Sequence, residues 1–558
     1  MDPEQLLDAL DPEQREAATS LVGPTCILAG AGTGKTRTVT HRIAYGIAKG
    51  QFAANRVLAL TYTSRAAGEL RARLRQLGIP GVAVKTFHAA ALGQLEFFWP
   101  QLAGVPAPNV LSSKGKIIAE AAEQLGIRFD AAMLRDVASE IEWRKYTMRS
   151  AEQYQAIAET RPQVAGLKPE QMVAIQKAYE DIKIKSQKLD WEDVLLLTLG
   201  MLQAEPRVLA HVQHQYRFFT VDEYQDISPL QQALLEAWLG DRSDLCVVGD
   251  PNQTIYSFSG ASSSNLLQFA STYPNAAIIS LTRNYRSTGN IIAMANRVIR
   301  GETSMDELES QGVSGAAPSI FEAKDSATEA EKIAGEIKEQ LARGIKPNEI
   351  AVLYRVNSQS ELFEKALADK GIDYQVRGGE RFFNRPEILQ LVRLVRAETI
   401  VPTDKPLYQI VSDAARELGW KSKEPTEGGA VREKWEALNS FIAIVDELPE
   451  GSSIADFVKE LDERIRSQHE PVKAAVTLST IHAAKGLEWD SVFLAGLNEG
   501  LLPISYAKTE LAIYEERRLF YVGITRARKE LSLSHSKLSA ISGREQAKSR
   551  FIDLVSGS

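Results

Sequence analysis

Short apolar runs alternate with longer amphipathic stretches near the start of the chain and again around residue 220. Runs of four or five apolar residues predict buried strands, and apolar positions three or four apart predict helices packed on a sheet. The alternation therefore indicates a parallel sheet covered by helices. The predicted strands of this first α/β domain are residues 25–29, 57–60, 218–221 and 245–248.

The pattern becomes helical between about residues 91 and 188, for instance over 115–125 and 169–185, and this predicts a helical insert. A second strand series follows at residues 278–281, 350–354, 476–480 and 492–495. We therefore expect an α/β fold of two domains, each with a mainly helical insert and with no internal repeat. The expected parts are 1–90 and 189–275 with insert 91–188, and 276–384 and 474–558 with insert 385–473.

Composition narrows the class of protein. The 558 residues are 44% hydrophobic and 25% charged, and no apolar run approaches the roughly 20 residues of a membrane span. We expect a cytoplasmic protein that does not associate with a membrane. A net charge of -7 argues against coating nucleic acid by bulk electrostatics, so any DNA contact should be a local groove. Cys26 and Cys246 lie in apolar runs typical of buried core thiols in a reducing compartment.

One glycine-rich segment carries a strong chemical signal. A predicted strand runs into it and a predicted helix leaves it, which is the setting of a phosphate-binding loop. Backbone N–H groups would wrap the phosphates of ATP, Lys35 would contact the outer phosphates, and the Thr36 hydroxyl would ligate Mg²⁺. A glycine-rich turn without function is the weaker alternative. The loop residues are Ala29, Gly30, Ala31, Gly32, Thr33, Gly34, Lys35 and Thr36, with Ala29 in place of the usual first glycine.

Two adjacent carboxylates follow the predicted strand at residues 218–221. Open α/β sheets place ligands at the carboxyl ends of their strands. Asp222 would hold Mg²⁺ and Glu223 would polarise the attacking water as general base. A solvated acidic turn is the alternative for an isolated Asp-Glu, but the phosphate loop favours catalysis.

The second domain has no phosphate loop of its own. It could instead supply arginines that stabilise charge in the transition state, and residues 281–287 and 515–528 carry candidates. Taken singly, each segment is also compatible with a surface ion-pair helix.

Together, these segments resemble superfamily 1 helicases of the UvrD, PcrA and Rep type, over nearly the whole chain and in the same order. The resemblance is carried by Leu-Asp-Pro-Glu-Gln at 10–14, Thr-Tyr-Thr-Ser-Arg at 61–65, Thr-Phe-His at 86–88, Leu-Asp-Trp-Glu-Asp at 189–193, Gly-Asp-Pro-Asn-Gln at 249–253 and Ile-His-Ala-Ala-Lys-Gly at 481–486. It implies two RecA-like P-loop NTPase domains.

The resemblance assigns further nucleotide contacts. Gln14 would read adenine, with Arg37 and Tyr285 on either face of the base. Gln253 would sense the γ-phosphate and Glu488 would contact the ribose. The γ-phosphate arginines would be Arg286 and Arg526.

The resemblance also assigns a DNA groove in which aromatic side chains stack on bases of any sequence. Phe258-Ser259 stands where relatives usually carry Trp-Arg, and Ser64-Arg65 where Asn-Lys is commonest. Trp191 could equally be a core tryptophan. The implied DNA contacts are Thr61, Tyr62, Thr63, His88, Trp191, Tyr256, Phe258 and His482.

The implied function is an ATP-dependent 3′–5′ DNA helicase in repair or replication restart, acting on single-stranded DNA and its junctions with duplex. We expect a monomer or weak dimer, with repair proteins or RNA polymerase as candidate partners. The motifs at residues 378–383 and 480–489 lie unusually close together, so the second insert should be reduced. A translocase that remodels nucleoprotein with little unwinding and a motor subunit of a helicase-nuclease are the alternatives.

Overall fold

The computed structural model contains two compact units, and each is described by itself. The first comprises Met1–Phe129, Val137–Tyr285 and Gly301–Gln311, and the second comprises Asp130–Asp136, Arg286–Arg300 and Gly312–Ser558. The residues described are 2–111, 113–161, 164, 166–257, 260–302, 305–377, 382–399, 405–423, 425, 430–448, 451–467, 475–540 and 543–556.

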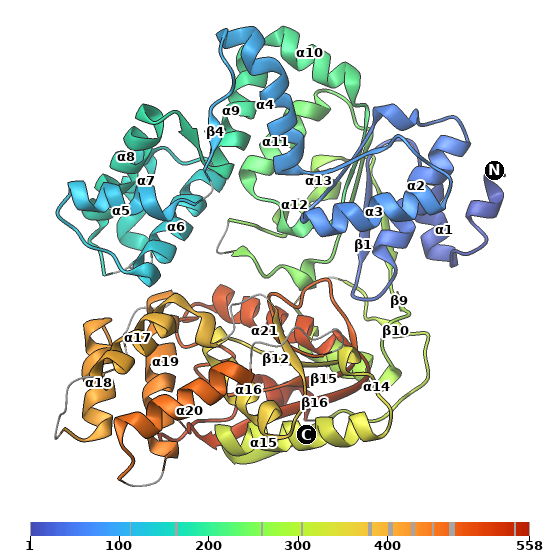
Figure 1. The fold of residues 1–558 in the computed structure, drawn as a ribbon. Coiled ribbons are helices and arrows are strands. Elements are labelled where there is room, and N and C mark those ends of the chain that lie inside the picture. The colour runs from blue at the N-terminus through green and yellow to red at the C-terminus, as the bar shows by residue number, and fades with distance from the viewer. Residues whose placement is uncertain are drawn as a thin grey trace. The chain divides into compact units, whose positions relative to one another are not determined.

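A six-stranded parallel sheet forms the centre of the first unit (Figure 1). Its strands are nearly continuous apolar runs, as expected when both faces of a sheet are covered. In spatial order they are β3 (Ala83–Thr86), β2 (Val57–Thr61), β6 (Phe218–Val221), β7 (Leu245–Gly249), β1 (Thr25–Ala29) and β8 (Ala277–Leu281).

Helices cover both faces of this sheet, and alternate strand residues point into two separate cores. Leu58 and Leu60 pack in one core, and Val57 and Ala59 pack in the other. The first core is closed by α4 (Phe87–Ala103), α9 (Trp191–Ala204), α10 (Pro206–Gln215), α11 (Pro229–Leu239), α12 (Ser264–Leu267) and α13 (Phe269–Thr272). The second is closed by α1 (Pro12–Thr19), α2 (Lys35–Ala48) and α3 (Ser64–Gln76).

The structure corrects one strand assignment. Residues 278–281 were expected to open the second α/β series, but β8 pairs in parallel with β1 of the first sheet. A hydrophobic pattern identifies a strand but not the strand with which it pairs, because pairing joins residues that are far apart in sequence. Beyond β8, the two-residue strands β9 (Arg283–Asn284) and β10 (Glu309–Ser310) pair with each other.

The helical insert of the first unit contains α5 (Gly115–Gln124), α7 (Ala151–Ile157), α8 (Pro169–Lys185) and, from Val137 onward, α6 (Ala131–Tyr146). Strands β4 (Asn109–Val110) and β5 (Lys188–Leu189) pair where the chain leaves and rejoins the sheet domain. Helix α4 packs into the core under the sheet, so the helices that stand apart in Figure 1 begin after it.

The second unit has its own six-stranded parallel sheet. In spatial order its strands are β11 (Ser319–Asp325), β16 (Ala527–Leu538), β15 (Trp489–Leu494), β12 (Ile350–Tyr354), β14 (Val476–Thr480) and β13 (Tyr374–Arg377). The helices of this part are α14 (Gly289–Ile299), α15 (Ser326–Ala342), α16 (Ser360–Asp369), α21 (Glu510–Ile524) and α22 (Arg550–Val555). Two α/β domains with helical inserts are therefore confirmed.

The insert of the second unit builds a separate hydrophobic core. Phe382, Phe441 and Phe457 are buried in it. Its helices are α17 (Pro386–Glu398), α18 (Leu407–Glu417), α19 (Ala430–Ala443) and α20 (Ile454–Ser467). Residues 378–381 of the expected motif lie outside the described residues.

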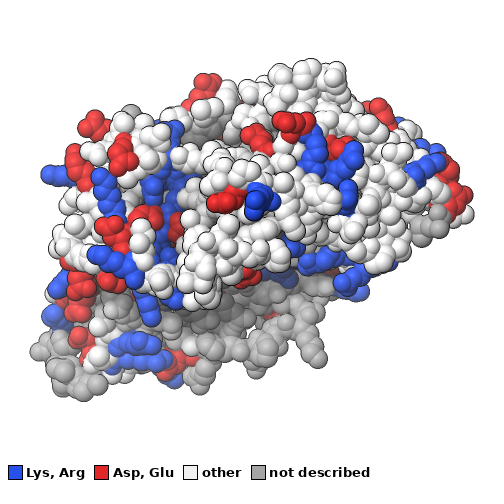
Figure 2. Space-filling view, turned by 90° about the horizontal axis from the view of Figure 1, so that it is seen from above, with Lys and Arg blue, Asp and Glu red and all other residues white. Residues whose placement is uncertain are grey.

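The structure also bears on the two cysteines and on membrane-spanning helices. Cys26 and Cys246 are both buried free thiols, and they belong to the cores on opposite faces of the sheet. Across the described ranges, no helix combines the length and apolarity needed to cross a membrane. On the face shown in Figure 2, basic and acidic side chains are interspersed.

Candidate nucleotide site and DNA-contact residues

The glycine-rich loop connects β1 to α2, as the sequence predicts. Gly32 (φ 69°) and Gly34 (φ 83°) adopt left-handed backbone conformations, which suit glycine because it has no Cβ. A Cβ on Gly34 would also lie only 2.7 Å from the side-chain nitrogen Nε2 of Gln14, which is too close for an ordinary contact. Lys35 Nζ donates to the carbonyl oxygens of Ala29 (3.0 Å) and Gly30 (3.4 Å). The lysine ammonium therefore lies over the loop that would hold phosphates.

The predicted adenine contacts gather around the start of α1. Asp11 caps this helix by accepting from the backbone N–H of Gln14 (2.8 Å), and the Gln14 side chain donates to the carbonyl of Thr33 (2.9 Å). Tyr285, which is 53% exposed, donates its hydroxyl to Asp11 (2.7 Å). Arg37 donates to the carbonyl of Ala9. The structure thus brings Gln14, Arg37 and Tyr285 to the region around the start of α1, and it adds Asp11 as a partner of both Gln14 and Tyr285.

The acidic pair lies at the carboxyl end of β6. Asp222 is buried and accepts from the backbone N–H of Glu223 (3.0 Å). Burial and then the charge of Glu223 raise the pKa of Asp222, and Lys35 opposes the shift. Glu223 has φ 54°, a conformation that costs a non-glycine residue about 1–3 kcal/mol and that concentrates at functional sites.

Gln225 connects this pair to the segment after β7. Its amide nitrogen donates to Glu223, and its amide oxygen accepts from the backbone N–H of Asp250 (3.0 Å). Asp250 in turn accepts from the side chain of Gln253 (2.6 Å). Burial raises the pKa of Asp250, while the charge of Lys35 lowers it. Sequence reasoning assigned no role to Gln225 or to Asp250, although both lie within three residues of a residue to which it gave one.

The site can be tested for a fit to magnesium. A buried carboxyl whose pKa is raised by a second carboxylate is an arrangement that a divalent cation would relieve. Asp222 and the Thr36 hydroxyl at the start of α2 are oxygen donors of the kind that Mg²⁺ prefers, with the other ligands coming from water and phosphate. Among the described residues no group of three or more His, Cys, Asp or Glu forms a metal cage. The residues fit an ion shared with a phosphate.

The predicted arginines of the second unit share one cluster. Arg286 binds Glu488 (2.6 Å) and the carbonyl of Thr525 (3.1 Å). Arg526 is buried and donates to the carbonyls of Val522 (2.9 Å) and Leu487 (3.2 Å).

The charge of Glu488 reflects this cluster. Burial raises the pKa of Glu488, but the nearby guanidinium groups outweigh it and the net shift is downward. Arg286 makes the largest of these contributions, and Arg528 and Arg526 add to it. Glu488 is therefore held ionised between arginines.

The predicted DNA contacts after β2 and β7 meet in an aromatic pair. Tyr62, which is 40% exposed, stacks on Tyr256 with ring centroids 5.3 Å apart and planes at 14°. Thr63 caps α3 and is exposed, whereas the side chain of Thr61 is buried, with no hydrogen-bond partner for its hydroxyl in the described part of the chain. Phe258 lies outside the described residues.

His88, Trp191 and Tyr146 form a second aromatic group. The ring of Trp191 is edge-on to His88 at 5.8 Å and is 44% exposed, so the core-tryptophan alternative is excluded. Tyr146 lies 3.3 Å from His88 Nε2 through its hydroxyl. Burial, followed by the charge of Lys114, lowers the pKa of His88 to about 4. Burial also lowers the pKa of His482, the remaining candidate, which follows β14 in the second unit.

Known families match both units. Residues 10–274 match the UvrD/REP helicase N-terminal domain, and residues 279–427 and 404–538 match the UvrD-like helicase C-terminal domain. The chain belongs to the UvrD/REP helicase family. Its membership agrees with the order of the motifs and with the two RecA-like domains.

Several curated relatives cover nearly all of this helicase. The ATP-dependent DNA helicase UvrD2 of Mycobacterium tuberculosis is 44% identical over 98% of this chain and 82% of its own length. The ATP-dependent DNA helicase PcrA of Bacillus subtilis is 30% identical over 98% and 86%, respectively. The ATP-dependent DNA helicase Rep of Escherichia coli is 31% identical over 95% and 91%.

Proposed function

We propose that this protein is an ATP-dependent DNA helicase that translocates 3′ to 5′ along single-stranded DNA and unwinds duplex at junctions. The observation that supports ATP-dependent action is the buried polar set around Lys35, in which the charge of Lys35 acts on both Asp222 and Asp250 and Gln225 links Glu223 to Asp250. The 3′–5′ polarity rests on the family resemblance alone. The relatives named as ATP-dependent DNA helicases support the same activity.

In the proposed reaction, the loop N–H groups and Lys35 bind the phosphates of ATP. Thr36 and Asp222 would hold Mg²⁺, which when bound would neutralise charge on the phosphate oxygens. Glu223 accepts a proton from the attacking water, and the contact of Gln225 with its carboxylate orients it. Gln253 responds to the state of the γ-phosphate.

The remaining nucleotide contacts have distinct roles in this proposal. Arg286 and Arg526 neutralise charge that develops on the γ-phosphate, and Glu488 contacts the ribose. Gln14 recognises adenine, with Arg37 and Tyr285 beside the base.

For DNA, the proposal uses stacking in place of base-edge recognition. Tyr62 and Trp191 present exposed aromatic rings, and the half-buried Tyr256 stacks on Tyr62. Every base has a π-face that could stack on such rings. Such contacts hold any sequence, as a translocating enzyme requires. The same groove would include His88, and the further contacts proposed are Thr61, Thr63, Phe258 and His482.

The cellular setting is proposed on the resemblance. The protein works in the cytoplasm, in DNA repair or replication restart, as a monomer or weak dimer. Repair proteins or RNA polymerase are the candidate partners.

Duplexes with a 3′ or a 5′ single-stranded tail test the proposal directly. Strand separation that needs ATP and a 3′ tail is the expected result. Unwinding from 5′ tails alone would contradict the polarity. DNA-stimulated ATP hydrolysis with displacement of a tightly bound protein, but with naked duplex left closed, would identify a remodelling translocase. Degradation of labelled DNA in Mg²⁺ would instead indicate a nuclease.

A further inference from the structure

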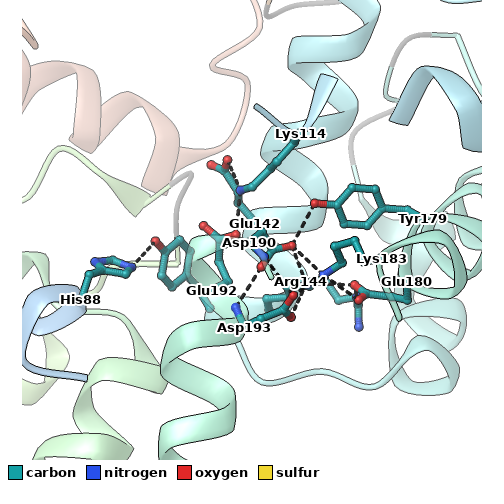
Figure 3. A network of polar contacts seen from close by, with 12 residues as sticks. His88, Lys114, Glu142, Arg144, Tyr179, Glu180, Lys183, Asp190, Glu192 and Asp193 are labelled. Atoms are coloured by element: carbon teal, nitrogen blue, oxygen red, sulfur yellow. Dashed lines mark hydrogen bonds and ion pairs between the residues drawn. The ribbon is translucent and has the colours of Figure 1, made fainter. Parts of the chain in front are cut away.

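A buried ionic network fastens the helical insert of the first unit to the start of α9 (Figure 3). Lys145, from α6, and Lys183, from α8, are only 2% and 1% exposed. Lys145 Nζ lies 2.6 Å from Asp190 and 2.7 Å from Asp193. Lys183 lies 2.8 Å from Asp190 and also binds Asp193. Two cations from the insert therefore converge on the same two carboxylates.

Those two carboxylates form the N-terminal cap of α9. Asp190 accepts from the backbone N–H of Asp193 (2.8 Å), and Asp193 accepts from the backbone N–H of Asp190 (3.1 Å). Asp190 also accepts from the hydroxyl of Tyr179 (2.9 Å) and is 1% exposed. Burial raises the pKa of Asp190, but Lys145 and Lys183 outweigh it, so the carboxylate stays ionised. The cap cannot rotate without breaking ion pairs in a buried place.

Trp191 is the first residue of α9 and directly follows the capping residue Asp190 in sequence. Its backbone follows the fixed Asp190, while its ring is 44% exposed and edge-on to His88. The end of α6 reaches the same group, because Tyr146 follows Lys145 and its hydroxyl lies 3.3 Å from His88. One side of Trp191 is thus fixed by the cap and the other by an aromatic neighbour.

We propose that Lys145 and Lys183 are positioning residues that hold Trp191 in the orientation in which it stacks on a DNA base. The inference rests on the proposed function, because it assumes that Trp191 contacts DNA. Neither lysine needs to touch the nucleic acid, since both are buried against the cap. The insert therefore contributes to the grip on single-stranded DNA through α9.

A double-mutant cycle on the full chain tests this coupling. Trp191→Ala should raise the Kd for a fluorescent oligothymidine about tenfold, the loss expected for one stacked base. Lys183→Met should raise the Kd about fivefold alone, but less than about 1.5-fold in the Trp191→Ala background, because its effect passes through the tryptophan. Lys183→Met alone should leave the DNA-free rate of ATP hydrolysis unchanged, because Lys183 is buried against the α9 cap.

The controls separate positioning from general damage. Lys177→Met removes an exposed lysine from the same helix and should leave the Kd unchanged. Lys183→Arg should restore most of the affinity, because it keeps the cation. Asp193→Asn provides a second, milder test if Lys183→Met does not fold, since Asp193 is partly exposed. The DNA concentration for half-maximal ATPase should rise about fivefold in Lys183→Met, with the maximal rate within about twofold.

Different results would overturn the positioning role and the proposed function. The positioning role would be overturned if Lys183→Met weakened DNA binding equally in both backgrounds, or in neither. The proposed helicase function would still stand in that case, provided that DNA stimulates ATP hydrolysis by the unaltered protein. A Trp191→Ala variant that binds DNA normally would overturn the positioning role as well. Absence of DNA-stimulated hydrolysis in the unaltered protein would instead overturn the proposed function itself.

Discussion

At the scale of single residues, the nucleotide site combines a backbone conformation of high energy with buried charge. Glu223 has a positive φ, and Gln225 binds its carboxylate. Asp222, immediately before it, is buried with a raised pKa. Both features cost stability in the free protein, and a bound Mg·ATP would compensate part of that cost.

Replacing the loop lysine tests the phosphate contact. Lys35→Ala should lower the rate of ATP hydrolysis by about 100-fold or more, because it removes the cation proposed to stabilise phosphate charge. Lys49→Ala, at the exposed end of the same helix, should have little effect. Steady-state phosphate release measures both. Hydrolysis that survives in Lys35→Ala would show that another group contacts the phosphates.

Glu223→Gln separates binding from chemistry. The amide keeps the size of the side chain but cannot accept the proton of the attacking water. We expect fluorescent ATP analogues to bind with nearly unchanged affinity, and turnover to fall by about 100-fold or more. Glu236→Gln, on exposed α11 surface, is the matched control. Retained turnover in Glu223→Gln would refute its role as general base.

The pKa of His88 predicts how stability depends on pH. Burial and then Lys114 lower this pKa to about 4, whereas an unfolded histidine titrates near about 6.5. Between these values the unfolded chain binds more protons, so the free energy of unfolding should fall as pH drops from about 6.5 towards 4. His88→Gln should remove about 1–3 kcal/mol of that dependence. Urea denaturation at several pH values measures the free energy of unfolding. An equal change of this free energy with pH in the unaltered protein and in His88→Gln would contradict the prediction.

At the scale of elements, strand ends and helix starts carry the chemistry. The loop of Lys35 follows β1, the acidic pair follows β6, and the Asp250 segment follows β7. These strands are neighbours in the sheet, so their carboxyl ends meet at one edge. Helix α9 follows the same principle in the proposed DNA contact, because Trp191 is its first residue and directly follows the capping residue Asp190.

Removing the α9 cap should cost much more than an ordinary cap. Asp190→Ala deletes the capping oxygen and leaves Lys145 and Lys183 short of a buried partner. We expect a loss of about 3–5 kcal/mol in the free energy of unfolding of the first unit. Asp181→Ala, an exposed position on α8, should cost less than about 0.5 kcal/mol. Thermal unfolding compares the two, and similar midpoints would show that the network contributes little.

At the scale of the whole molecule, each unit brings a different part of the chemistry. The first has the phosphate loop and the acidic residues, and the second has a cluster of arginines around Glu488. Arg286 and Arg526 are held there by carbonyl groups and, for Arg286, by the carboxylate of Glu488. A motor needs such a division if hydrolysis is to change how one unit acts on the other.

Arg286→Ala tests the contribution of the second unit. If Arg286 neutralises the γ-phosphate as proposed, its loss should lower the maximal ATPase rate by about 1,000-fold and leave ATP binding nearly intact. Arg550→Ala, which breaks an exposed pair with Glu499, serves as the control. Stopped-flow binding and phosphate release measure the two steps. An unchanged maximal rate would remove Arg286 from the mechanism.

The sequence by itself determined the local features. Apolar runs identified strands such as β1 and β12, and residue types at fixed spacing identified the phosphate loop and the Asp222-Glu223 pair, because these signals are contained in a few consecutive residues. The resemblance extended the site to Gln14 and Glu488.

The tertiary structure decided which distant residues are partners. It paired β8 with β1, buried the side chain of Thr61, exposed Trp191, and joined Lys145 and Lys183 to Asp190. Strand pairing, burial and ion pairs depend on groups brought together from far along the chain. Their free energies arise only when those groups meet and lose water, so a local pattern does not contain them.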